Sequence, residues 1–416
     1  MKGAELGERY FQHTFPNGLT LLCEKMPGMQ SAAMTLLLPA GAASDPADQS
    51  GTAAVVGELV LRGAGQRDSR QLTDHLDSLG LQRSSNVAVH HTRFAACGVA
   101  DKVMRGLEVY ADIVRRPHLP EEGFQAARDL SLQSLESIED EPRQKVSIKL
   151  REWHWPNPYG RNPMGEKEHL LRLTRDYCQT DFQRRYHPQD SMIALAGNID
   201  FDQAKAAIEQ HFADWKGPPT DPIVLTPPPG NYHFQKQDSE QTHIAIAYKA
   251  LPENHDEYYR ARLAVECLSG GMSGRLFTEV REKRGLCYSV GASYASLKGI
   301  GSVLGYAGTS NDRAQATLDC FVSELHRLSD GVEKDELDRA KIGLKASIIM
   351  SGESTSSRSG AIAHDFFIRG RIRTLDEISK VLDAVNVDQV NDYLKKNKPG
   401  PFTIVIVGPK ELKIPS

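Results

Sequence analysis

Two side chains in the second half of the chain, Arg281 and Tyr288, could act together on one oxygen atom. They lie seven residues apart within Leu268 to Val290, which reads LSGGMSGRLFTEVREKRGLCYSV. Arginine carries a permanent positive charge and tyrosine offers a phenolic donor, so the pair could hold an anionic or carbonyl oxygen. The spacing places the two residues on either side of a helix end, where their side chains could converge.

Three glycines before this pair determine how the backbone can run. Gly270, Gly271 and Gly274 permit a sharp turn or a close approach to another chain, because they lack a Cβ atom. A helical pattern resumes over Arg275 to Lys283 and is followed by the start of a strand. The segment is therefore predicted to be a turn, a charged helix and a strand.

The composition describes an ordinary protein of more than one domain. A length of 416 residues exceeds what one hydrophobic core usually serves. The net charge of −4 gives no reason to expect nucleic acid as a partner. The apolar runs Ala32 to Leu38 and Thr403 to Val407 are too short to cross a bilayer, so no membrane span is expected.

The number and spacing of the cysteines indicate the redox state of the compartment. The chain has six, without a C-x-x-C pair, and its size removes the need for disulfides. We expect free, mostly buried thiols in a reducing compartment. The predicted location is the cytoplasm, with the periplasm as the alternative if the N-terminus is processed.

A proline-rich segment divides the chain. Residues 217–230, GPPTDPIVLTPPPG, contain six prolines and no helical periodicity, which is typical of an extended linker. The predicted domains are residues 1–216 and 231–416. A second polar run, SGESTSSRSG at 351–360, is interpreted as a flexible turn between helices. In the first half, hydrophobic patterns predict strands at 19–24, 32–38, 94–99 and 192–196, and helices at 107–114, 124–138, 177–186 and 202–212.

The two halves repeat one another. Several separate segments align at a constant offset of 211 residues, and Ala32 to Leu36 falls on His243 to Ala247 at that offset. The chain is therefore predicted to be an internal duplication of one α+β unit of about 200 residues. The clearest matches are Asp181, Pro188, Ile193 and Gly197 with Asp392, Pro399, Ile404 and Gly408.

Residues 51–63, GTAAVVGELVLRG, form a helical segment of small residues that carries a resemblance. The chain resembles the pitrilysin, insulysin and mitochondrial-processing-peptidase family of inverted-motif zinc peptidases, whose first half carries G-x-A-H-x-x-E-H-x-x-F-x-G. Gly51, Ala53 and Gly63 fit that frame, and Leu61 takes the aromatic position. The resemblance implies two homologous α/β-sandwich domains, each a mostly antiparallel sheet covered by helices.

The metal-binding residues of that motif are replaced. The two family histidines fall on Ala54 and Glu58, the general-base glutamate falls on Gly57, and the third ligand, a later glutamate, falls on Ser134. Catalytic zinc needs three protein ligands and an open position for water, and only Glu58 could donate here. We expect no metal in this chain and no peptide hydrolysis by the chain alone.

The segment around Arg281 and Tyr288 keeps the family's pattern, a glycine-rich turn followed by R-x-x-x-x-x-x-Y. The resemblance implies that both side chains reach the substrate beside the zinc of a partner, with Gly270, Gly271 and Gly274 in a substrate-binding loop. The chain is thus expected to be the non-catalytic subunit of a heteromeric zinc metallopeptidase. It would form half of a peptide chamber with a homologous, zinc-bearing subunit and assist transition-state stabilisation.

Three alternatives stay open. The chain could be a structural scaffold, like the peptidase-related core subunits of respiratory complexes, or a homodimer that binds peptides without proteolysis. The third concerns the residues alone: Arg281 would form a surface ion pair with a neighbour such as Glu282, and Tyr288 would be buried in a sheet.

Overall fold

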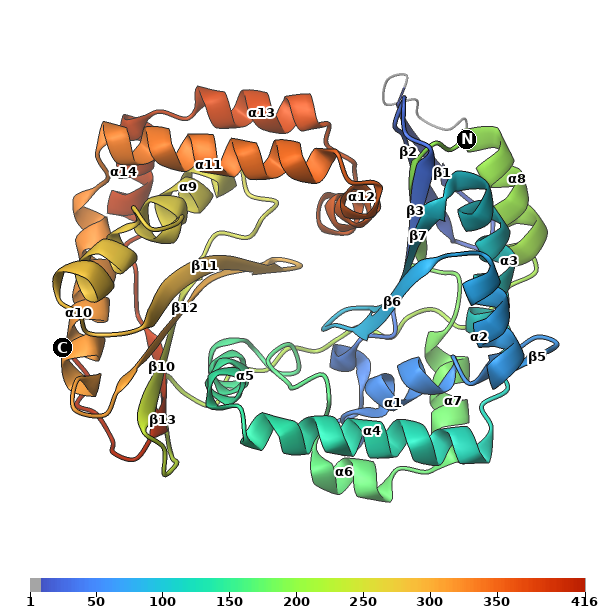
Figure 1. Ribbon diagram of the computed structural model, residues 1–416, viewed down its shortest axis with the longest axis horizontal. Coiled ribbons are helices and arrows are strands. Elements are labelled where there is room, and N and C mark those ends of the chain that lie inside the picture. The colour runs from blue at the N-terminus through green and yellow to red at the C-terminus, as the bar shows by residue number, and fades with distance from the viewer. Residues whose placement is uncertain (1–8, 416) are drawn as a thin grey trace. The chain divides into compact units, whose positions relative to one another are not determined.

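The computed structural model describes residues 9–415, which form two compact units of mixed α and β structure (Figure 1). The first unit contains the chain up to Ser137, Arg161–Leu225 and Ser351–Phe366. The second contains Ile138–Gly160, Thr226–Met350 and the chain from Phe367 onward. Each unit consists of a largely antiparallel sheet with helices packed against it, which confirms the predicted fold class.

The first unit is built on a six-stranded sheet in the order β1-β2-β8-β3-β7-β6. Adjacent strands in this sheet are antiparallel, except for β2 and β8, which are parallel. The central strands are continuous apolar runs because both of their faces are covered. The strands are β1 (Tyr10–Thr14), β2 (Thr20–Lys25), β3 (Ser31–Leu38), β6 (Gln82–Val87), β7 (Thr92–Val99) and β8 (Met192–Gly197). A small ribbon joins β4 (Gly63–Ala64) to β5 (Arg67–Asp68).

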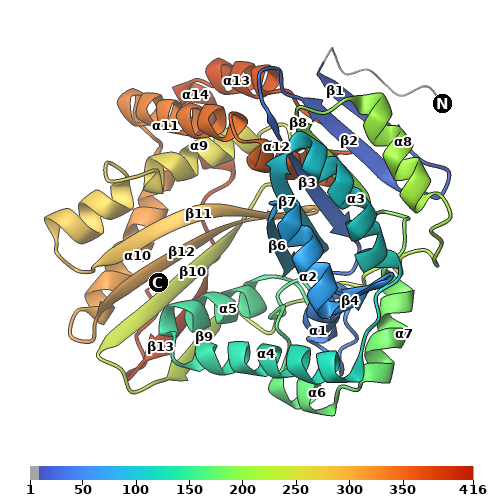
Figure 2. The ribbon, with the colours of Figure 1, turned by 45° about the vertical axis from the view of Figure 1, so that its right-hand side comes forward.

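Helices α3 and α8 lie side by side over one face of this sheet (Figure 2). In α3, Val103, Leu107 and Val114 recur at helical spacing and belong to the same hydrophobic core as Phe94 and Ile193 of the sheet. The helices that lie wholly or mostly in the first unit are α1 (Thr52–Leu59), α2 (Ser69–Ser78), α3 (Ala100–Arg115), α4 (Glu121–Glu139), α6 (Lys167–Arg172), α7 (Arg175–Arg185), α8 (Phe201–Phe212) and α12 (Thr355–Arg369), with the short η1 (Ala42–Ser44). Every strand and helix predicted for the first half is present. The bounds differ by at most three residues, except that α3 begins at Ala100, seven residues before the predicted start.

The second unit has a five-stranded sheet in the order β11-β12-β10-β13-β9, of which β13 and β9 are parallel. Its strands are β9 (Tyr232–Lys236), β10 (Gln241–Ala250), β11 (Ser289–Leu297), β12 (Ile300–Ser310) and β13 (Thr403–Gly408). Its helices are α5 (Pro142–His154), α9 (Tyr258–Ser269), η2 (Phe277–Lys283), α10 (Ala314–Arg327), η3 (Leu328–Asp330), α11 (Lys334–Gly352), α13 (Leu375–Ala384) and α14 (Val387–Lys396).

The two sheets have the same topology once β1 is set aside, as a duplication requires. Thr20 lies opposite Met192 in one parallel pair and Tyr232 lies opposite Ile404 in the other, with the same separation along the chain. One register departs from the predicted offset: Ala32 lies opposite Gly197, whereas His243 lies opposite Val407 and not Gly408. One residue has therefore been gained or lost between the copies of these strands.

Each unit takes one helix from the other half of the chain. Helix α5 packs Val146 and Leu150 against Ala247 and Val405 of the second sheet. Helix α12 belongs to the first unit, where Ser359 Oγ lies 3.0 Å from Thr35 Oγ1. The predicted boundary at residues 217–230 divides the chain into two continuous halves. The compact units are not continuous, because each half contributes one of these two helices to the other unit. At the predicted offset residues 142–154 fall on 353–365, within or next to α12, so the exchanged helices are copies of one another.

The interpretation of residues 351–360 as a flexible turn between helices was correct only in part: the run joins α11 to α12 through residues 353–354, and its other residues are helical. Helix α12 begins at Thr355, and Arg358 and Ser359 are only 4% and 1% exposed. Two polar side chains of the run meet the first sheet: Ser359 lies beside Thr35, and Arg358 donates to Glu24. Residues 217–230, in contrast, contain no helix or strand, and Thr226 exchanges two main-chain hydrogen bonds of 2.9 Å with Asn157.

All six cysteines are free thiols, and five of them are buried. Between residues 9 and 415, none of the helices combines the length and the apolar character needed to cross a bilayer.

The end of α5 buries a histidine that should make stability depend on pH. The Nδ1 atom of His154 lies 2.9 Å from Thr403 Oγ1, and its Nε2 atom lies 3.0 Å from Ser302 Oγ. Burial, assisted by the positive charge of Lys249, lowers the pKa of His154 from 6.5 to about 4. The folded protein therefore holds this side chain neutral at pH values where the unfolded chain protonates it.

We expect the second unit to lose stability as the pH falls from 6.5 towards 4, by about 1.4 kcal/mol per pH unit from this group. Urea unfolding at pH 7, 6 and 5 would measure the loss. A His154→Gln variant, which cannot titrate, should show a shallower dependence than the wild type. Parallel stability curves for the two proteins would contradict the assignment.

Candidate functional site

The glycine-rich turn of the second unit connects α9 to η2 and requires glycine for local reasons. Gly271 has a φ of +131°, which L side chains rarely adopt. A Cβ atom at Gly270 would lie 2.5 Å from the carbonyl oxygen of Glu266, and one at Gly274 would lie about 3 Å from main-chain atoms. The three glycines are thus explained by the turn itself. Next to them, Met272 is exposed.

A buried arginine that the sequence analysis did not single out holds this turn in place. Arg275 donates from Nε and Nη2 to the two carboxylate oxygens of Glu336, each at 2.7 Å, and from Nη2 to the carbonyl oxygen of Gly331 at 2.8 Å. The hydrogen bonds to Glu336 raise the pKa of Arg275. Ser269 Oγ also accepts a hydrogen bond of 2.9 Å from the N–H of Ala292, which joins the start of the turn to β11. In the sequence, the only indication that Arg275 holds the turn was its position directly after the last glycine.

Arg281 and Tyr288 are both exposed at the surface of this unit. Arg281 lies on η2, a π-helical segment of a kind often found at functional sites, and its guanidinium lies over the Phe277 ring, 4.7 Å from the ring centroid. Tyr288 is 85% exposed, and its main-chain N–H donates to the carbonyl oxygen of Gly308 at 3.3 Å.

The alternative in which Arg281 forms a surface ion pair and Tyr288 is buried in a sheet is therefore wrong. Across residues 9–415, Arg281 forms no ion pair with Glu282 or with any other carboxylate, and Tyr288 is not buried in a sheet. No hydrogen bond joins the two side chains within that range either. A guanidinium stacked on a ring and a phenol in solvent can both contact another molecule.

In the first unit, helix α1 is held by a buried carboxylate. Asp45 accepts hydrogen bonds from the N–H groups of Gly51 at 2.8 Å and Ala53 at 3.1 Å, at the helix N-terminus. Gly51 has a φ of +93°, so this entry to the helix favours glycine. Asp45 also pairs with Arg185 at 2.9 Å, and burial raises the pKa of the Asp45 carboxyl although Arg185 opposes the shift.

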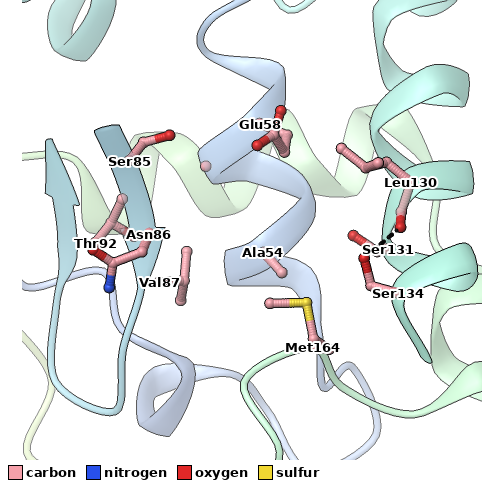
Figure 3. A pocket seen from close by; sticks show the side chains of 11 residues that line it. Ala54, Glu58, Ser85, Asn86, Val87, Thr92, Leu130, Ser131, Ser134 and Met164 are labelled. Atoms are coloured by element: carbon pink, nitrogen blue, oxygen red, sulfur yellow. Dashed lines mark hydrogen bonds between the residues drawn. The ribbon is translucent and has the colours of Figure 1, made fainter. Parts of the chain in front are cut away.

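The four positions onto which the family's metal site is predicted to fall line a single cavity of about 200 Å³ (Figure 3). Ala54, Gly57 and Glu58 come from α1, and Ser134 faces them from α4. The structure therefore brings together residues separated by about 80 positions in the sequence. The remaining lining residues are Ser85, Asn86, Val87, Thr92, Leu130, Ser131 and Met164.

The residues of this cavity do not fit a zinc ion. Glu58 is the only carboxylate among them, and it lies 3.9 Å from Arg62. Ser134 Oγ donates back to the carbonyl oxygen of Leu130 at 2.9 Å. A Cβ atom at Gly57 would lie 3.1 Å from Cγ2 of Val87, so that valine occupies the direction a general base would need. In the part of the chain that the structure describes, no three His, Cys, Asp or Glu residues are grouped so that they could hold a metal.

Comparison with known proteins finds one family across most of the chain. The family model described as insulinase (peptidase family M16) matches residues 20–166, and the model described as the peptidase M16 inactive domain matches residues 172–344. Among curated relatives, an uncharacterized zinc protease of Rickettsia felis is 24% identical over 399 residues, covering 95% of this chain and 97% of the relative. The uncharacterized zinc protease YmxG of Bacillus subtilis is 26% identical over 406 residues, covering 96% and 98%.

Solved structures share the fold over nearly the whole length. A peptidase M16 inactive domain from Pseudomonas fluorescens has a TM-score of 0.86 at 21% identity, covering 98% of this chain and 99% of that chain. A protease from Helicobacter pylori has a TM-score of 0.85 at 19% identity, with 96% and 99% covered.

Proposed function

The chain belongs to the insulinase (M16) peptidase family, and on that premise we propose that it is the non-catalytic subunit of a heteromeric zinc metallopeptidase. One contrast carries the proposal. The cavity at the family's metal position offers one carboxylate and no histidine, while Arg281 and Tyr288 are exposed and unengaged by any carboxylate among residues 9–415. Groups of this kind could act on a peptide whose scissile bond is held at the zinc of a second subunit.

The chemistry assigned to this chain is stabilisation of an oxygen that gains negative charge. When bound in the partner, zinc would activate water and polarise the scissile carbonyl. The phenol of Tyr288 would donate a hydrogen bond to that oxygen, and the guanidinium of Arg281 would supply positive charge beside it. Stacking on Phe277 restricts the rotamers of Arg281, so less conformational freedom is lost when it engages the substrate.

The partner in this proposal is a homologous chain with a complete H-x-x-E-H motif. The substrates are unfolded peptides that enter a chamber of which this chain forms one half, and the turn at Gly270, Gly271 and Gly274 lies close to them. The relatives named zinc proteases support the reaction class for the family. The loss of the ligand set supports a division of labour between two chains.

Reconstitution tests the proposal. The homologous zinc-bearing subunit, sought first in a neighbouring reading frame, would be purified and mixed with this chain in equal amounts. We expect a quenched fluorescent peptide to be hydrolysed by the mixture far faster than by either chain, and chelation of zinc to stop the reaction. A mixture that stays silent would overturn the heteromeric assignment. Hydrolysis by this chain alone, with about one bound zinc per chain, would overturn its non-catalytic role.

A further inference from the structure

A second exposed arginine of the second unit, Arg143, is stacked on an aromatic ring as Arg281 is. It lies in the first turn of α5, and its guanidinium lies over the ring of Tyr306 on β12, 4.9 Å from the ring centroid. We propose that Arg143 binds a carboxylate of the substrate peptide close to Tyr288, so that this chain selects peptides with an acidic side chain or a free C-terminus near the bond to be cleaved. The inference rests on the proposed function, because it names the kind of peptide that this site would take.

The guanidinium of Arg143 has no anionic partner within residues 9–415. Asp140 and Glu141 are close to it in the sequence, but neither forms an ion pair with it, and Glu139 is paired with Lys145 at 2.5 Å. Stacking uses the flat face of a guanidinium and leaves the N–H groups, which lie in its plane, able to donate. A carboxylate matches two of these parallel donors, so it is the ligand group that suits this arginine best.

The ring beneath Arg143 is held in place by the second sheet. The hydroxyl oxygen of Tyr306 lies 2.9 Å from Nδ1 of His243 on β10, and the ring packs on the apolar cluster that contains Val146 and Leu150 of α5. Burial lowers the pKa of His243 and the charge of Arg143 lowers it further, so the imidazole is neutral at pH 7 and adds no second cation. The positive charge of Arg143 is therefore presented at a defined place, and little side-chain freedom is lost when it engages a ligand.

Gly308 places this arginine close to Tyr288. The main-chain N–H of Tyr288 donates to the carbonyl oxygen of Gly308 at 3.3 Å. A Cβ atom at Gly308 would lie only 2.6 Å from the hydroxyl oxygen of Tyr306, so the phenol that carries Arg143 lies directly against this glycine. An extended peptide advances about 3.3 Å per residue, so a carboxylate bound at Arg143 would belong to a residue only a few positions from the bond near Tyr288.

Binding of three peptides to the isolated full-length chain tests the inference. Each is an acetylated decapeptide of serine and threonine with one different central residue or terminus: a central glutamate with an amidated C-terminus, a central glutamine with an amidated C-terminus, and a central glutamine with a free C-terminal carboxylate. An uncharged dye reports binding through fluorescence anisotropy, because an anionic dye would itself compete for the arginine. The first two peptides differ only in the side-chain charge, and the last two differ only in the terminal charge.

We expect at least one of the carboxylate peptides to bind the wild type saturably, and about tenfold or more tightly than the uncharged glutamine amide, because a hydrogen bond between charged groups is gained. The peptide that shows this preference identifies the source of the carboxylate as the side chain or the C-terminus. If neither carboxylate peptide binds more tightly than the amide, the inference is overturned.

Variants of α5 assign the preference to Arg143. Arg143→Gln should bind the preferred carboxylate peptide and the amide equally, and Arg143→Lys should keep part of the preference, because lysine retains the charge without the planar fork of donors. Lys149→Gln is the matched control: Lys149 lies on the same helix but is paired with Glu152 at 2.7 Å, so its removal should leave the preference unchanged. The ratio of two affinities for one protein is compared, so a smaller folded fraction does not mimic the effect.

A preference for carboxylate that survives Arg143→Gln, or that is lost to the same extent in Lys149→Gln, would contradict the assignment. The outcome is independent of the reconstitution experiment. A silent mixture with the zinc-bearing subunit would overturn the heteromeric function and leave the binding preference in place, whereas equal binding of all three peptides beside an active mixture would overturn only the role of Arg143.

Discussion

Replacement of Tyr288 by phenylalanine should lower the kcat of the reconstituted peptidase by about 10²–10³-fold while KM changes little. The phenol is proposed to donate to the substrate oxygen only as that oxygen becomes negatively charged, so its loss affects the transition state more than substrate binding. Phenylalanine keeps the ring, and at an 85% exposed position it should not disturb folding. Initial rates with a quenched fluorescent peptide, over a range of substrate concentrations, measure the effect.

Arg281→Ala should reduce kcat/KM to a similar extent, and Arg281→Lys should restore only part of it, because lysine lacks the planar fork of donors. Lys283→Ala is the matched control: Lys283 lies on the same helix but is paired with Glu279 at 2.8 Å. If the Arg281 and Tyr288 variants retained full activity while the mixture remained active, the chain would act as a scaffold and not through these residues.

Replacement of Arg358 by methionine should destabilise the first unit by about 3–5 kcal/mol. Arg358 Nε lies 2.8 Å from Glu24 Oε2, and the two side chains are almost completely buried between α12 and the first sheet. Removal of the cation leaves a carboxylate uncompensated in the protein interior, which costs far more than the loss of a surface ion pair. Urea unfolding followed by circular dichroism would measure the change.

The double variant Glu24→Leu, Arg358→Met should recover most of that loss, because a well-packed apolar pair replaces a buried ion pair at little cost. Arg371→Ala is the matched control, since Arg371 and Glu377 form an exposed pair worth no more than about 1 kcal/mol. A loss below that level for Arg358→Met, or a double variant as unstable as the single one, would show that α12 is not anchored to the first sheet by this pair.

This ion pair also explains why a polar run was misjudged from the sequence. Serine, glycine and threonine at 351–360 are typical of loops because their side chains bond to nearby backbone groups. In the structure α12 begins within this run, at Thr355, and Ser359 meets Thr35, more than 300 positions away in the chain. The composition of a segment indicates its local conformational preference, but it contains no information about a contact with a residue so far away in the chain.

Features that depend on local chemistry can be recognised without a structure. The turn at Gly270, Gly271 and Gly274 follows from backbone freedom. The positions onto which the family's metal site is predicted to fall, Ala54, Gly57, Glu58 and Ser134, offer one carboxylate and no histidine. The duplication was likewise visible as a constant offset, apart from a slip of one residue between β10 and β13.

The folded structure, in contrast, sets which side chains are buried and which remain available to another molecule. It placed Tyr288 in solvent and Arg281 on Phe277, where the sequence allowed an ion pair and a buried ring. It also exchanged α5 and α12 between the two units and brought Ala54, Gly57, Glu58 and Ser134 together around one cavity. The physical reason is that burial and cavity shape arise from contacts between segments far apart in the chain, which local propensity and spacing do not encode.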